Sequence, residues 1–114
     1  MKVEIKEWWG QAQEDLDTSH YLYDGNKFEE AAFFCQQAIE KGLKAIMLTE
    51  GERVPKIHDL VVLGEEVDLP LEFQEVCREL CVIYISTRYP GVAEVKDIKN
   101  KAARYINTTE KILQ

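Results

Sequence analysis

The 114 residues are enough for one domain, residues 1–114, with a single hydrophobic core. Hydrophobic residues make up 46% of the chain and charged residues 31%, which is typical of a globular protein and excludes a disordered or fibrous chain. The formal net charge of −7 disfavours sequence-independent binding to nucleic-acid backbones. No apolar run approaches the ~20 residues that cross a bilayer, so we expect no membrane contact and a cytoplasmic location.

The first half of the chain carries the apolar spacing of two long helices. Apolar residues recur at steps of three and four over residues 3–23 and again over residues 27–49. Gly25 is expected to end the first helix in the left-handed conformation, and Asn26 to cap the second. The second helix is expected to stop at Gly51.

The second half predicts one short and two long helices. The short helix is expected over residues 59–66, and Pro70 is expected at the first position of a long helix that ends before Pro90. An amphipathic pattern from Val92 to the C-terminus predicts the last helix. No alternating pattern typical of strands is present. The predicted fold is all-α: an up-down antiparallel helical bundle of four long helices plus one short helix.

The three cysteines favour a packing role over a metal site. Cys77 and Cys81 lie one helical turn apart among apolar neighbours, as buried thiols do. Neither His20 nor His58 is near them in sequence to complete a tetrahedral zinc site. Phosphate-cradling glycine loops and nucleophile-elbow motifs are lacking as well. We therefore expect no metal and no cofactor.

Three polar residues on the second predicted helix form one candidate binding face. Gln37, Lys41 and Lys44 follow one another at helical spacings of four and three, so they can share a face. The alternative is local helix support, because Glu40 precedes Lys44 by four residues and such pairs stabilise a helix slightly.

A second candidate lies where the third long helix ends. Arg88 and Tyr89 precede Pro90, and an arginine beside an aromatic ring can hold a phosphate and stack on a base. An ordinary turn is the alternative. His58 stands before Asp59 at the start of the short helix, where Asp59 can cap free amides and the imidazole can serve in packing.

Several short segments occur in a fixed order and cover most of the chain between Trp8 and Pro90. The segments are Trp8, Ala12 and Asp15-Leu16, then Tyr23-x-Gly25, Phe28-Glu29-Glu30-Ala31-Ala32-Phe33, Gln37-Ala38-Ile39-Glu40-Lys41-Gly42-Leu43-Lys44-Ala45, His58-Asp59-Leu60 and Tyr84-x-x-x-Arg88-Tyr89-Pro90. Together they resemble the HEPN family, in the prokaryotic branch associated with minimal nucleotidyltransferases.

The resemblance implies a helical bundle that forms homodimers and is encoded beside a minimal nucleotidyltransferase, in some branches as a toxin or ribonuclease. Aromatic pairs at Trp8-Trp9 and Phe33-Phe34 place apolar groups on more than one helical face, which also favours a homodimer. The expected function is a nucleotide-binding or nucleotidyltransferase-partner module of a toxin–antitoxin-like system. Its ligand, a nucleotide or RNA, would contact Arg88, Tyr89, Lys41, Lys44 and His58.

Ribonuclease members of the family carry a histidine that is separated from the arginine by four to six intervening residues. Here those positions after Arg88 are Ala93, Glu94 and Val95, so the general acid–base of metal-independent cleavage is missing and we assign no catalytic residue. Two alternatives remain open. One is a metal-independent endoribonuclease that pairs Arg88 with a non-standard histidine such as His58, and the other is a non-catalytic dimeric scaffold.

Overall fold

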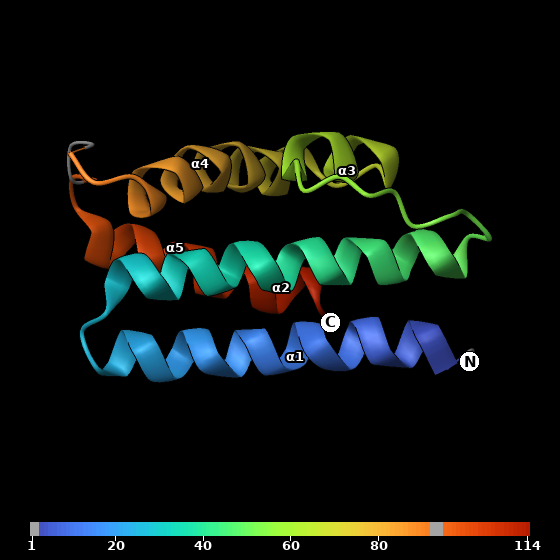
Figure 1. The fold of residues 1–114 in the computed structure, drawn as a ribbon, viewed down its shortest axis with the longest axis horizontal. Coiled ribbons are helices and arrows are strands. Elements are labelled where there is room, and N and C mark those ends of the chain that lie inside the picture. The colour runs from blue at the N-terminus through green and yellow to red at the C-terminus, as the bar shows by residue number, and fades with distance from the viewer. Residues whose placement is uncertain (1–2, 92–94) are drawn as a thin grey trace.

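The computed structural model describes residues 3–91 and 95–114, without the side chains of residues 86–88. These residues form five helices and no strand, which confirms the predicted all-α fold (Figure 1). The helices are α1 (Val3–Asp24), α2 (Phe28–Thr49), α3 (Leu60–Glu66), α4 (Leu71–Arg88) and α5 (Ile98–Ile112).

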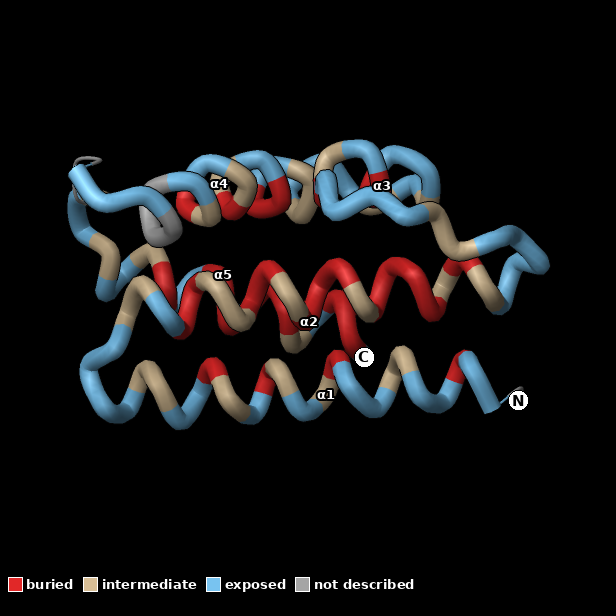
Figure 2. The backbone as a smooth tube through the Cα atoms, in the orientation of Figure 1, coloured by how far each residue is buried: buried red, intermediate tan, exposed pale blue. Residues whose placement is uncertain are grey.

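The four long helices run alternately up and down along a bundle with extents of 40 × 25 × 24 Å (Figure 1). Helix α2 is central and contacts all four other helices, while α3 packs beside α4. A central helix buries side chains around most of its circumference. Figure 2 accordingly shows buried residues along nearly the whole length of α2 but at separate positions on α1.

The first two helices end near their predicted positions, but a different residue takes the left-handed conformation in the turn between them. Asn26, and not Gly25, takes the left-handed conformation, with φ +63°. The Lys27 N–H donates to the Leu22 carbonyl at 2.8 Å, which satisfies an open carbonyl at the end of α1. The expectation that Asn26 caps α2 is therefore wrong, since Lys27 is at the cap position and no side chain caps that helix. Gly51, at φ +80°, ends α2 as predicted.

The short helix begins as the sequence predicts, but the last helix begins later. The Asp59 side chain accepts hydrogen bonds from the amides of Val61 and Val62 at 2.9 and 3.4 Å, which fixes the start of α3. Helix α5 begins at Ile98 because Asp97 has a left-handed φ of +55°, which interrupts a right-handed helix. The predicted start at Val92 lies outside the described residues.

Side chains from every helix meet in one core. Cys35 and Cys77 are buried in it, and burial raises the pKa of their thiols to about 11 and about 12, so both are neutral packing groups. Cys81 is partly buried against the same core. Among the described helices, none has a stretch that is both long and apolar enough to span a bilayer.

Candidate functional site

Helix α2 carries two charged side chains into the protein interior. Glu40 is 5% exposed and Lys44 3% exposed, and the Lys44 Nζ lies 3.1 Å from the Glu40 Oε2. The ammonium group also lies 5.5 Å from the centre of the Trp8 ring, within the range of a cation–π contact. Burying either charge without the other would cost free energy, so each residue can be buried only because the other compensates its charge.

His58 joins this pair from the loop before α3. Its Nδ1 lies 2.8 Å from the same Glu40 Oε2, while 79% of the side chain is exposed. Because a carboxylate only accepts hydrogen bonds, Nδ1 carries the proton and donates, which leaves Nε2 available on the imidazole ring. The position of His58 follows from local structure, since the next residue, Asp59, is fixed as the cap of α3.

The second oxygen of Glu40 has no hydrogen-bond partner. Lys44 and His58 both contact Oε2, whereas Oε1 is buried and unpaired. Within the described part of the chain it is the only buried side-chain nitrogen or oxygen in this condition. Leaving a buried polar atom unsatisfied costs roughly 1–3 kcal/mol. A buried oxygen without a partner, in the core of a small domain, indicates a position where a hydrogen-bond donor would lower the free energy of the protein.

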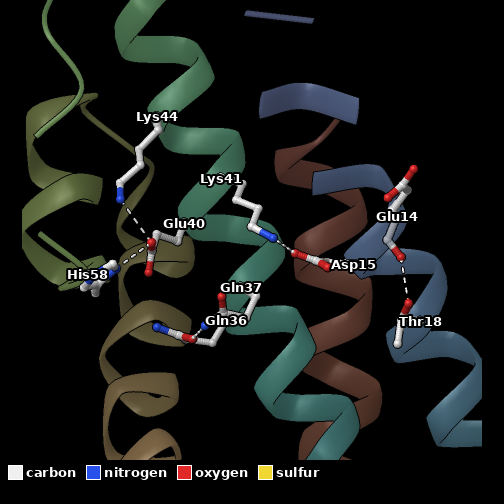
Figure 3. Close-up of polar contacts among 9 residues, drawn as sticks. All are labelled: Glu14, Asp15, Thr18, Gln36, Gln37, Glu40, Lys41, Lys44 and His58. Carbon is white, nitrogen blue, oxygen red and sulfur yellow. Dashed lines mark hydrogen bonds and ion pairs between the residues drawn. The ribbon is translucent and has the colours of Figure 1, made fainter. Parts of the chain in front are cut away.

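A hollow of about 220 Å³ lies beside this carboxylate, lined by Gln36, Gln37, Glu40, His58 and Tyr84. The Gln37 Nε2 donates to the Gln36 Oε1 at 2.8 Å, which fixes the two carboxamides against each other. Figure 3 shows Glu40 between His58 and this glutamine pair. Tyr84 supplies an aromatic ring from α4, stacked on Phe33 at a centroid distance of 5.9 Å. Polar groups from α2 and the loop therefore face an aromatic group from α4.

Lys41 does not take part in this site. Its Nζ lies 2.7 Å from the Asp15 Oδ2, so it ties α2 to α1, whereas Lys44 contacts Glu40 (Figure 3). Of the predicted face of Gln37, Lys41 and Lys44, Lys41 therefore pairs with α1, whereas Lys44 pairs with Glu40 of its own helix and also lies over Trp8 of α1. Of the sequence-predicted residues, Lys44 and His58 are brought together, and both contact Glu40.

The predicted Arg88-Tyr89 turn lies at the end of α4. Tyr89 follows the helix with its ring exposed, and its N–H donates to the Ile85 carbonyl at 3.3 Å. Arg88 is the last residue of α4, one helical turn beyond Tyr84, and its side chain lies outside the described residues. Ala93 and Glu94 also lie outside them, and Val95 packs against the core.

A second polar cluster joins α4 to α5. Glu79 accepts hydrogen bonds from Arg104 and, at 2.9 Å, from the Tyr105 hydroxyl. Burial alone would raise the pKa of Glu79, but these two hydrogen bonds, together with the positive charges of Arg104 and Lys101, outweigh it and hold the pKa below its usual range. Burial and the carboxylate raise the pKa of Tyr105. The cluster fixes one helix to the other, and among its described side chains no buried nitrogen or oxygen lacks a hydrogen-bond partner.

The fold and the buried carboxylate hollow define a small helical-bundle protein with a polar site between its second and fourth helices. The HEPN domain model matches residues 5–114, and the chain belongs to the HEPN domain family. No curated protein matches the sequence.

Two solved structures are similar along nearly the whole chain. TT1696 from Thermus thermophilus is 27% identical, with a TM-score of 0.83 over 98% of this chain and 94% of that one. ST0689, an archaeal HEPN homologue, is also 27% identical, with a TM-score of 0.78 over 99% of this chain and 93% of that one. Both share the helical arrangement described above.

Proposed function

We propose that this HEPN-domain protein binds a nucleotide in the hollow between α2, α4 and His58. The observation that carries the proposal is the meeting of a buried carboxylate, two carboxamides, an imidazole and an aromatic ring around one space. Ligand sites typically combine apolar walls with a few convergent polar groups. An unpaired buried oxygen among those groups distinguishes the hollow from an ordinary surface depression.

The size of the hollow limits what it can hold. Sites for drug-sized ligands measure roughly 300–1,000 Å³, so about 220 Å³ suits one ring of a nucleotide and leaves the phosphates outside. Arg88 and Tyr89, one turn beyond Tyr84 along α4, are the residues that we assign to the phosphates, because a guanidinium pairs with phosphate oxygens. The net charge of −7 favours a mononucleotide over a long polyanion.

Calorimetric titration with ATP, GTP, CTP and UTP tests this function. We expect binding to at least one of them, with a loss of affinity of tenfold or more in Arg88→Ala and in His58→Ala. His20→Ala is the matched control, since His20 is paired with Glu110 on α5 and lies apart from the hollow. Absence of heat with every nucleotide would rule the function out.

A homodimer through α4 is part of the proposal. Val82 and Ile85 are each more than half exposed and lie three residues apart on α4, and the exposed Tyr89 follows the helix. Neighbouring exposed apolar groups favour a protein interface. Light scattering should report a dimer that Val82→Glu and Ile85→Glu dissociate. Tyr21→Glu should leave it intact, because Tyr21 is equally exposed but lies on α1.

The family resemblance supports a minimal nucleotidyltransferase as the partner, in a toxin–antitoxin-like pair. The adjacent gene identifies the partner to test, and co-purification of the two proteins from one operon is the expected result. Separate elution of the two proteins at micromolar concentration would contradict the proposed partner and would leave the proposed nucleotide binding unaffected.

A metal-independent endoribonuclease is the second candidate, favoured by one contact. The Glu40 carboxylate holds His58 through Nδ1 and leaves Nε2 available to move a proton, which is the arrangement of an oriented general base. His58 and Tyr84 line the same hollow, and Tyr84 lies one helical turn before Arg88 on α4. Purified protein should then degrade RNA in a manner abolished by His58→Ala and Arg88→Ala but unaffected by His20→Ala. Cleavage that persists in both site variants excludes this candidate.

A further inference from the structure

The outward side of α1 is a helix face without a partner in the described part of the chain. Helix α1 contacts α2 and α5, and Figure 1 shows it at one edge of the bundle. At 3.6 residues per turn, a set of exposed residues lies within about 40° of one line along this side. We call this set the outer stripe, and its members are Val3, Glu7, Gly10, Glu14, Asp17 and Tyr21.

Large apolar side chains lie at both ends of the outer stripe. Val3 is 71% exposed and Tyr21 is 80% exposed. They are 18 positions apart in the sequence, which corresponds to five helical turns, so they lie on one line about 27 Å apart. Tyrosine is one of the residues that contribute most to binding at protein interfaces. Two apolar groups at this separation along a straight line suit a straight, extended partner, and a second helix is the natural one.

Between these two side chains, Gly10 leaves the helix backbone uncovered. An added Cβ at this position would have no atom of another segment within 4 Å, so no packing contact inside the described chain requires a glycine there. Glycine within a helix is destabilising relative to alanine, but it permits another backbone to approach closely. A helix that crosses the outer stripe at Gly10 would account for a residue that the fold itself does not need.

The charges of the outer stripe restrict the chemistry of such a helix. Glu7, Glu14 and Asp17 are exposed, and none of them forms an ion pair with another described residue. The stripe contains no basic residue. A second copy of the same face would bring like charges together, which is unfavourable. Lysine or arginine side chains on the incoming helix would complement the three carboxylates.

We propose that the outer stripe docks an amphipathic helix of another protein, in which an apolar row is flanked on both sides by lysine or arginine. The apolar row packs on Val3, Gly10 and Tyr21, and the flanking basic side chains pair with the carboxylates of the stripe. This surface is separate from the α4 face of the proposed homodimer and from the hollow at His58. Each protomer of that dimer therefore presents one docking face, whether or not a nucleotide is bound.

A synthetic helical peptide of about 20 residues, long enough to span the outer stripe, tests the proposal. The peptide carries leucines at helical spacing with lysines on both sides, and its control carries glutamates in place of the lysines. Calorimetry with the whole chain at about 0.15 M salt should show the lysine peptide binding at least tenfold more tightly than the glutamate peptide. Equal affinities, or no binding of either peptide, would overturn the proposal.

Variants of the stripe distinguish docking from general attraction to a chain with a net charge of −7. Gly10→Gln fills the space above the backbone without changing any charge, so the affinity for the lysine peptide should fall at least tenfold while the unfolding temperature stays the same or rises. Tyr21→Ala should reduce the affinity by a similar factor. Ala103→Gln, at an exposed position on α5, is the matched control and should bind like the unmodified chain. An affinity that is unchanged in both Gly10→Gln and Tyr21→Ala would overturn the assignment to this face.

Discussion

His58 and Glu40 are 18 residues apart in sequence, and a 2.8 Å contact between Nδ1 and Oε2 joins an exposed imidazole to a buried carboxylate. The contact crosses the boundary between surface and core. It therefore links a residue that solvent and ligands can reach to one that the fold depends on. Substitutions at its two ends should have unequal consequences.

Replacing the exposed end should affect stability only modestly. His58→Ala removes one hydrogen bond to Oε2 but leaves Lys44 paired with that oxygen, so we expect a loss of about 0.5–1.5 kcal/mol in the free energy of unfolding. Urea denaturation monitored by circular dichroism measures this loss of unfolding free energy. A loss of unfolding free energy as large as that in Lys44→Met would contradict this expectation, because it would show that the fold depends on His58 as much as on Lys44.

Replacing one partner of the buried pair should be far more costly. Lys44→Met leaves the Glu40 charge buried with only His58 beside it, and breaking a buried pair in this way typically costs about 3–5 kcal/mol. Adding Glu40→Gln to that variant should recover part of the loss, because the uncompensated charge is then gone. A double-mutant cycle measures the coupling, and additive losses would contradict the pairing.

Two glycines within helices should respond in opposite directions to alanine. At Gly42 an added Cβ would lie 2.5 Å from the Leu113 Cδ2, so Gly42→Ala should force the Leu113 side chain to move and destabilise the protein by ~1 kcal/mol. At Gly10 nothing lies within 4 Å of such a Cβ, so Gly10→Ala should stabilise α1 by about 0.5–1 kcal/mol. Thermal unfolding of the two variants in parallel tests the close contact between α2 and the chain end.

The cluster at Glu79 should make stability depend on acidity. The pKa of Glu79 is lowered in the folded protein, so the folded state favours the charged carboxylate. The resulting stabilisation is present above the unfolded pKa of about 4.3 and is lost as the pH falls through the lower folded pKa. Glu79→Gln should therefore reduce stability near pH 7, by ~1 kcal/mol or less because the pair is partly exposed, and the difference should vanish in acid. A difference that grows on acidification would reverse the assigned sign.

Apolar periodicity and helix-end residues were sufficient to predict the bundle. Asp59 at the start of α3, Pro70 before α4 and Gly51 after α2 act through local backbone chemistry, which a sequence displays directly. The exchange of roles between Gly25 and Asn26 is also local, since both residues tolerate the left-handed conformation.

The site was less predictable because it depends on which helix is central. Glu40 and Lys44 have the spacing of an ordinary exposed pair, and only the packing of the other helices around α2 buries them. A signal was present in the flanking residues: Ile39 and Leu43 directly precede the two charges, so apolar residues extend around most of the helix. Tyr84 and Gln36 gave no such signal, because their contribution depends on distances across the bundle.

The central position of α2 also limits how the protein can change over evolutionary time. Gln36 and Glu40 line the hollow and are at the same time packed among the other helices, so a substitution there would alter the proposed nucleotide binding and the folding together. His58 is the member of the lining that can vary at small cost to the fold. Divergence of ligand preference among relatives should therefore begin at the rim and reach α2 only with compensating substitutions in its neighbours.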